Sequence, residues 1–267
     1  MRKLKKFIRK IRGRNKAPSH QTSKTQLQEF FARFRQSYAC VDLIRVGGQG
    51  DGGYLIPDFA SKIKFCFSPG VAQVASFEEA LQELYGTFCF LCDASVEQAP
   101  IQNDKTEFEK MFLGSYDDGN FMTLSSWVAR RVDDRSSGML LQMDIEGAEY
   151  DVLIREDTDF LKRFDCLVIE FHGLEKLWDV MNFRMISSVF DKLLLEFVVV
   201  HAHPNNCCGI YLKDGIGIPR VAEFTFLRRD ILGCYEKQRN IILPHPLDRK
   251  NVGKNDDLVM PNIWWHN

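Results

Sequence analysis

Acidic and imidazole side chains gather where apolar runs of the sequence end. Asp144 ends one run, Glu170 and His172 stand two residues apart at the end of the next, and His203 follows His201 at the end of a third. Residues two apart on a strand point to the same face of a sheet. Such carboxylates and imidazoles serve as general acids and bases on a hydroxyl substrate, or as ligands of a Mg²⁺-type ion. The predicted catalytic group is Asp144, Glu170, His172 and His203.

A second pair of residues predicts a nucleotide-binding turn. Gly70 follows an apolar run in the string Ser-Pro-Gly-Val, and Asp93 follows the next run, 23 positions later. In nucleotide-binding βαβ units a glycine turn lets the backbone approach the ligand, and an acid at about this spacing accepts hydrogen bonds from the ribose. The turn lacks the G-x-G-x-x-G pattern of a pyrophosphate cradle, which favours a nucleoside ligand without phosphates over NAD. Gly70 and Asp93 are the expected cofactor-binding residues.

Two other motifs favour structural roles. Cys89 and Cys92 form a C-x-x-C pair, but on a strand they face opposite sides, and no second pair stands at zinc spacing. The glycine-rich residues 47–54 lack the Lys-Ser/Thr of a P-loop, so a tight turn is the preferred interpretation. The eight cysteines fall mostly in apolar runs. This pattern is typical of small buried side chains in a reducing compartment such as the cytoplasm, not of a disulfide framework.

Apolar runs alternate with helical patterns from residue 63 onward. The expected strands span residues 63–67, 88–92, 139–143, 166–171, 197–200 and 210–212, and the expected helices span 76–85, 124–131, 150–154 and 183–195. Near-continuous apolar runs are typical of parallel strands that are buried on both faces. The alternation predicts a doubly wound, mostly parallel α/β sheet, with residues 224–227 as an antiparallel edge strand. Ser76 and Glu79 have the spacing of a capping box. Ligands of such sheets bind beyond the carboxyl ends of the strands.

The net charge of −1 hides two electrostatically different parts. Residues 1–16 hold nine of the 35 Lys and Arg residues and no acid, so the remainder carries 26 basic and 36 acidic residues. An acidic body argues against nucleic acid as a partner, because phosphate binding needs a basic face. No apolar run reaches the roughly 18 residues that a bilayer-spanning helix needs.

The first sixteen residues have the pattern of a short amphipathic helix. Leu4, Phe7, Ile8 and Ile11 lie at helical spacing among the basic residues. This pattern predicts a reversible, peripheral anchor on an anionic membrane surface. A solvated tail and a transit peptide are the alternatives. Equal binding to anionic vesicles with and without residues 1–16 would contradict the anchor.

One string of the sequence carries a family resemblance. Residues 144–149, D-I-E-G-A-E, resemble the signature of FkbM-type S-adenosylmethionine-dependent methyltransferases. Four further strings resemble features of one branch of that family. They are G-D-G-G-Y at 50–54, S-F-E-E at 76–79, L-S-S-W at 124–127 and I-E-F-H at 169–172. Together these strings cover roughly residues 45–230. The turn at Gly70 departs from the Asp-x-Gly-x-x-x-Gly pattern that is more usual in the family.

The resemblance implies a Rossmann-like methyltransferase fold, S-adenosylmethionine as methyl donor, and O-methylation of a small hydroxylated, glycan-related acceptor. By position it implies that Gly70 lies under the methionine portion of the cofactor, that Asp93 holds the ribose, and that Asp144 lies near the sulfonium and the acceptor. The expected segments are a basic amphipathic segment at 1–16, an N-terminal extension at 17–62 and the methyltransferase domain at 63–267. A binding protein without catalysis and a metal-dependent enzyme of another class stay open as alternatives.

Overall fold

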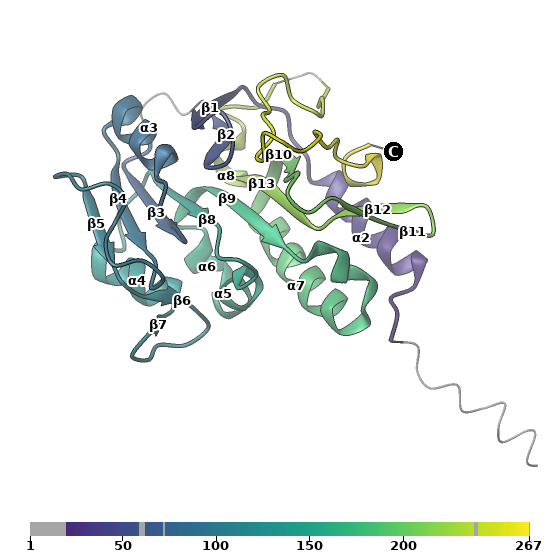
Figure 1. Cartoon of the computed structure of the whole chain (residues 1–267), viewed down its shortest axis with the longest axis horizontal. Helices are drawn as coiled ribbons and strands as arrows, with labels where there is room; N and C mark the ends of the chain where they lie inside the picture. Colours follow the sequence, from purple (N-terminus) through teal and green to yellow (C-terminus); the bar gives the residue numbers. More distant parts are fainter. Residues whose placement is uncertain (1–19, 59–61, 72, 238–239, 267) are drawn as a thin grey trace, which may run out of the picture.

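A seven-stranded sheet forms the centre of the molecule (Figure 1). The computed structural model describes residues 20–58, 62–71, 73–237 and 240–266, so the helix predicted for residues 1–16 lies outside the described residues. The strand order is β10-β13-β9-β8-β3-β4-β5. The strands are β3 (Phe65–Pro69), β4 (Phe88–Cys92), β5 (Thr106–Glu109), β8 (Met139–Met143), β9 (Phe164–His172), β10 (Phe197–Pro204) and β13 (Val221–Arg228).

The sheet is mostly parallel, as predicted. Strands β5, β4, β3, β8 and β9 pair in parallel, whereas β13 runs antiparallel between β9 and β10. The strand predicted at residues 224–227 is therefore antiparallel, but its expected place at the edge was wrong. β13 is flanked on both sides, which agrees with its nearly complete burial. Residues 210–212 also lie outside this sheet, in a hairpin of β11 (Ile210–Lys213) and β12 (Ile216–Pro219).

Helices cover both faces of the sheet. Along each central strand alternate side chains enter different clusters, so that Cys66 and Cys89 face one side while Phe67 and Phe90 face the other. The first side is covered by α3 (Ser76–Tyr85) and by a hairpin of β1 (Leu43–Gly47) and β2 (Gly53–Pro57). The other side is covered by α4 (Leu124–Arg131), α5 (Glu149–Arg155), α7 (Val180–Glu196) and α2 (Lys24–Gln36). The prediction of a doubly wound fold is confirmed.

The remaining elements are short. They are β6 (Phe112–Leu113), β7 (Phe121–Met122), α6 (Thr158–Leu161), α8 (Arg229–Leu232) and the 3₁₀ turns η1 (Leu174–Trp178) and η2 (Asn262–Trp264). No helix in the described part of the chain is long and apolar enough to cross a membrane.

The described residues before β3 are packed into the body of the molecule. Ser23 begins α2 with a capping box to Gln26, and the buried aromatic face of the helix joins the core under β9 and β13. The ring of Phe34 lies 5.4 Å from that of Phe224 on β13 and 5.4 Å from that of Trp264. On the opposite face the Thr225 hydroxyl donates a 2.6 Å hydrogen bond to the Leu55 carbonyl of β2. Residues before 63 therefore help to form both sides of the core.

The cysteines fall into two groups. Cys66, Cys89, Cys92 and Cys166 are buried, as their apolar surroundings predicted. The adjacent Cys207 and Cys208 are exposed and form a disulfide, contrary to the expectation that disulfides are absent. The reason that this pair differs is its place in a surface turn after β10, not in an apolar run.

We predict that Phe34→Ala lowers the free energy of unfolding by about 3–5 kcal/mol, because it removes a fully buried ring from an aromatic cluster and leaves a cavity. Urea denaturation measures the change. Gln28→Ala, on the exposed side of the same helix, is the control, and we expect it to unfold like the wild type. A Phe34→Ala variant as stable as this control would show that α2 is only loosely attached.

Candidate functional site

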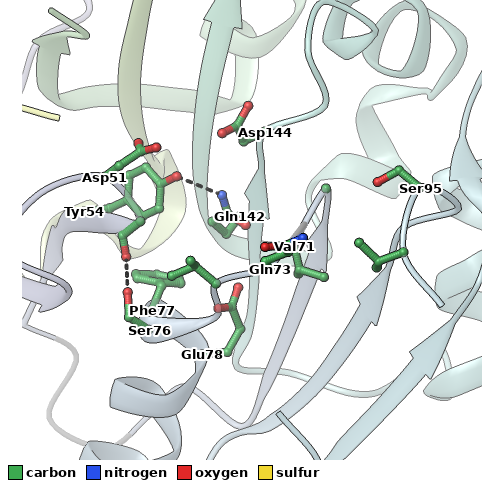
Figure 2. Close-up of a pocket in the computed structure, with 14 residues that line it drawn as sticks. Asp51, Tyr54, Val71, Gln73, Ser76, Phe77, Glu78, Ser95, Gln142 and Asp144 are labelled. Carbon is green, nitrogen blue, oxygen red and sulfur yellow. Dashed lines mark hydrogen bonds between the residues drawn. The ribbon is translucent and has the colours of Figure 1, made fainter. Parts of the chain in front are cut away.

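A cavity of about 470 Å³ opens at the carboxyl ends of β3 and β8. Its wall includes Asp51 and Tyr54 from the N-terminal hairpin, Gly70 after β3, Ser95 after β4 and Asp144 after β8 (Figure 2). The rest of the wall comes from the loop before α3 and the first turn of that helix, and from Gly52, Val96 and Gln142. The cavity thus lies where the doubly wound fold predicts a ligand site.

Gly70 brings two strand ends into contact. Its φ is +86°, and a Cβ built on it would lie 1.7 Å from the carbonyl oxygen of Asp144. Only glycine adopts this backbone conformation at little cost and leaves room for such an approach. The predicted glycine turn therefore lets the backbone at Asp144, after β8, lie directly against the backbone after β3.

Asp93 lies beside the cavity. It is buried at the end of β4, and its Oδ1 accepts a 2.7 Å hydrogen bond from the backbone N–H of Ser95. Ser95 and the next residue, Val96, line the cavity. The carboxyl group of Asp93 thus shapes the loop at this end of the cavity.

Three of the four predicted catalytic residues meet around the imidazole of His172. Its Nε2 lies 3.9 Å from Asp144 Oδ1 and 3.5 Å from Glu170 Oε1. Its Nδ1 lies 3.1 Å from Oε1 of Glu149. Glu149 is fully buried and also accepts the backbone N–H of Gly147, so it holds both the ring and the turn.

The charge states of this group are strongly perturbed. Burial raises the pKa of Asp144 to about 7, and the nearby charge of His172 opposes part of that rise. Burial by itself lowers the pKa of His172, but the hydrogen bond from Glu149 and the surrounding carboxylates raise it overall. The Oδ1 of Asp144 is buried and accepts no hydrogen bond from the described residues. Near neutral pH the Asp144 carboxyl can therefore take up or release a proton.

A row of buried polar residues extends from this group across the sheet. Glu170, Glu223 and His203 are register partners on β9, β13 and β10. Both oxygens of Glu170 accept from the amide of Asn205, at 3.1 and 3.3 Å, and Glu223 accepts from Asn251 at 2.5 Å. Burial is the main cause that raises the pKa of both carboxyl groups.

His203 stands apart from the other three predicted residues. Its Nδ1 faces Oδ2 of Asp248 at 3.6 Å, and the Nε2 of His201 lies 2.8 Å from Oδ1 of the same carboxylate. Burial alone would raise the pKa of Asp248, but the two histidines hold it well below its usual range. His203 therefore does not join the group around His172, because Glu223 separates it from Glu170 and Asp248 binds it from the other side.

The sequence reasoning missed a polar chain beneath the cavity. The Ser68 hydroxyl contacts a carboxyl oxygen of Glu78 and lies 2.6 Å from Oε1 of Gln142, whose Nε2 donates to the Tyr54 hydroxyl at 3.2 Å. In the sequence, Tyr54 and Glu78 are marked only by the family resemblance. Tyr54 falls in the G-D-G-G-Y string and Glu78 in the S-F-E-E string. The glycine-rich segment is a turn, as predicted, but it also carries Asp51 and Tyr54 to the cavity.

Two groups of side chains have the spacing of metal ligands. One is Asp144, Glu149 and His172, and the other is Asp51, Glu170 and Glu223; within each, the candidate ligand atoms lie within 4.8 Å of one another. Carboxylates of this kind suit hard cations such as Mg²⁺. The first group contains the predicted catalytic residue Asp144, and the second contains the predicted catalytic residue Glu170.

Comparison with known proteins finds a match to a methyltransferase family in the part of the chain that contains this site. Residues 73–197 match the family model of the methyltransferase FkbM domain. This match contains Asp93, Asp144, Glu170 and His172, and it confirms the resemblance found in the sequence. The match supports a methyltransferase domain at these residues, which are 125 of the chain's 267. No curated protein matches the chain.

Solved structures show only weak likeness. A fibrillarin/Nop5p complex matches with 9% identity and a TM-score of 0.37, over 62% of this chain and 73% of that one. A putative hemolysin from Lactococcus lactis matches with 11% identity and a TM-score of 0.34, over 78% and 89%. The precorrin-6y C5,15-methyltransferase of Geobacter metallireducens GS-15 matches with 9% identity and a TM-score of 0.32, over 79% and 93%. Likeness at this level says nothing about activity.

We predict that Asp144→Asn stabilises the protein at high pH. The folded pKa of Asp144, about 7, exceeds the ordinary 3.8, so the folded state binds a proton that the unfolded chain has lost. Stability therefore falls as the pH rises from about 4 to 7. An asparagine cannot ionise and escapes this loss, so the variant should be more stable by about 2–4 kcal/mol at pH 8 and equal to the wild type near pH 4.

Urea denaturation at several pH values measures this difference. The control is Glu29→Gln, which removes an exposed acid from α2, away from the site, and should leave the pH profile unchanged. A stability gap between Asp144→Asn and the wild type that does not vary with pH would contradict the raised pKa.

Proposed function

We propose that this chain, in which residues 73–197 match the methyltransferase FkbM domain family, transfers a methyl group from S-adenosylmethionine to a hydroxyl group of a glycan-related acceptor. The observation that carries the proposal is the half-buried Asp144 carboxyl group, with a pKa of about 7, beside His172 at the edge of the cavity. Acceptor hydroxyl groups need a base of this kind, because they lose a proton when they are methylated.

The residues around the cavity fit a nucleoside cofactor. The volume falls in the range of about 300–1,000 Å³ that small-molecule sites occupy. The unpartnered Oδ1 of Asp144 leaves an acceptor for a ligand group. We place the methionine portion of the cofactor over Gly70 and the ribose near Asp93 and Ser95, as the family resemblance implies. When bound, S-adenosylmethionine supplies a methyl group on a positively charged sulfur, which is a good leaving group.

The chain must align the acceptor and receive its proton. The Asp144 carboxylate would receive the proton that the acceptor hydroxyl loses when it is methylated. The charge of His172 keeps part of Asp144 ionised near neutral pH, and Glu149 holds the imidazole in place. Correct alignment of the reacting groups accounts for much of the rate in such transfers.

The polar row beyond Asp144 suits an acceptor that is rich in hydroxyl groups. Glu170, Asn205, Glu223 and Asn251 offer carboxylate and amide groups that accept and donate hydrogen bonds. Sugar hydroxyls both donate and accept, so these groups match them in chemistry. Glu170, Asn205 and Glu223 are buried and lie outside the cavity wall, so the glycan-related acceptor rests on the family resemblance.

The same groups give a second candidate mechanism, in which a Mg²⁺-type ion binds between Asp144, Glu149 and His172. Such an ion would lower the pKa of an acceptor hydroxyl and orient it. The residues fit it by type and spacing. Methyl transfer that survives exhaustive chelation would contradict this variant of the proposal.

We predict that Asp144→Asn and His172→Ala each lower methyl transfer about 10²-fold or more, because they remove the proton acceptor or the group that keeps it ionised. The measurement is transfer of labelled methyl from S-adenosylmethionine to a panel of methyl glycosides. Calorimetry checks that the variants still bind S-adenosylhomocysteine. Glu29→Gln, an exposed acid on α2 away from the site, should keep full activity. A wild type that binds the cofactor and methylates none of the glycosides would contradict the acceptor class.

A further inference from the structure

Glu78 is a buried carboxyl group that faces the cavity without a charged partner. It lies in the first turn of α3, is 3% exposed, and lines the cavity together with Gly70 and Asp144 (Figure 2). Its side-chain hydrogen bond in the described part of the chain is with Ser68, and no ion pair is formed there. The proposed chemistry at Asp144 does not use this group.

Such a carboxyl group is costly to bury. An ionised carboxylate removed from water loses several kcal/mol of hydration unless a cation or several hydrogen bonds replace it. Burial is the main cause that raises the pKa of Glu78, and the hydrogen bond with Ser68 only partly opposes it. Its place near the N-terminus of α3 offers a modest compensation. A glutamine would fill the same space without this cost, so the carboxyl group is best explained by a cation that enters the cavity.

The position of Glu78 identifies which cation this is. Ser68 stands on β3 two residues before Gly70, and Gln142 stands on β8 two residues before Asp144. Glu78 contacts this lower level, through Ser68, whereas Asp144 lies at the upper level where the strands end. A ligand with its sulfonium near Asp144 and its methionine portion over Gly70 therefore has one further cation, its ammonium group, for the lower level.

We propose that Glu78, oriented by Ser68, binds the ammonium group of the methionine portion of the cofactor. This inference rests on the proposed function, because it takes S-adenosylmethionine as the ligand of the cavity. It assigns the role of a charged anchor to the α3 helix.

The hydrogen-bond network accommodates both charge states of Glu78. The Ser68 hydroxyl has one proton and faces acceptor oxygens on Glu78 and Gln142. With Glu78 protonated, its carboxyl group donates to Ser68, which donates to Gln142. With Glu78 ionised by an ammonium partner, Ser68 donates to the carboxylate, and Gln142 turns its amide over to donate to Ser68. The chain therefore needs no backbone movement to receive the ligand.

Calorimetry with two ligands tests the assignment. S-adenosylhomocysteine carries the ammonium group, and 5′-methylthioadenosine has the same nucleoside and sulfide without the amino-acid portion. Glu78→Gln should weaken binding of S-adenosylhomocysteine by about tenfold or more, because it removes a charge-assisted hydrogen bond. It should change binding of 5′-methylthioadenosine by less than about twofold. Glu79→Gln, its exposed neighbour, should bind both ligands like the wild type.

The outcomes separate the two proposals. An equal loss for both ligands, or no loss for either, overturns the role of Glu78 while cofactor binding by the wild type stands. A wild type that binds neither ligand nor S-adenosylmethionine overturns the proposed function and this inference with it. Should Glu78→Gln fail to fold, Ser68→Ala replaces it, with a smaller but equally selective loss for S-adenosylhomocysteine expected.

Discussion

Burial of carboxyl groups at the carboxyl ends of the strands is the constraint on which the site depends. Glu78, Asp144, Glu170 and Glu223 all leave water when the chain folds, and burial is in each case the main cause that raises the pKa. A fold maintains such groups only where neighbouring elements hold them in place. Here desolvation raises the pKa of Asp144 to about 7, so that this carboxyl group can exchange protons near neutral pH.

The surrounding architecture supplies that support from distant parts of the sequence. The hairpin that carries Tyr54 is tied to β13 through Thr225. Asn251 and Asp248 come from the segment after α8 and bind Glu223 and the histidines of β10. The close approach of Gly70 to Asp144 sets the depth of the cavity between these walls. The wall of the cavity thus includes Asp51, Tyr54 and Gly70, which lie outside the matched residues 73–197.

Periodic patterns predicted the central elements well. The expected strand at 139–143 and the expected helices at 76–85 and 124–131 agree with the observed bounds, because burial repeats along each of them. The place of β13 between β9 and β10 leaves no mark in local periodicity, so it was missed. The capping box expected at Ser76 was also wrong, because its hydroxyl donates to the Gly52 carbonyl 24 positions away.

The positions of the candidate site residues were also predicted only in part. The rule that ligands bind at strand ends located Asp144, Glu170 and His172 correctly in one group, since parallel neighbours bring their carboxyl ends together. It failed for His203 because the antiparallel β13 inserts Glu223 beside Glu170. Glu78 and Gln142 were not predicted as site residues, because a single polar residue inside a helix or strand forms no motif with a recognisable spacing. Only the three-dimensional contact with Ser68 reveals them.

The central claim is that the cavity between Gly70, Ser95 and Asp144 binds the methyl donor. The most direct measurement is a crystal structure of the protein grown with S-adenosylhomocysteine. We expect electron density for the ligand in this cavity, with its amino-acid portion over Gly70, its ribose toward Asp93 and its sulfur facing Asp144. Ligand density at another place on the molecule, or a cavity that stays empty at saturating ligand, would contradict it.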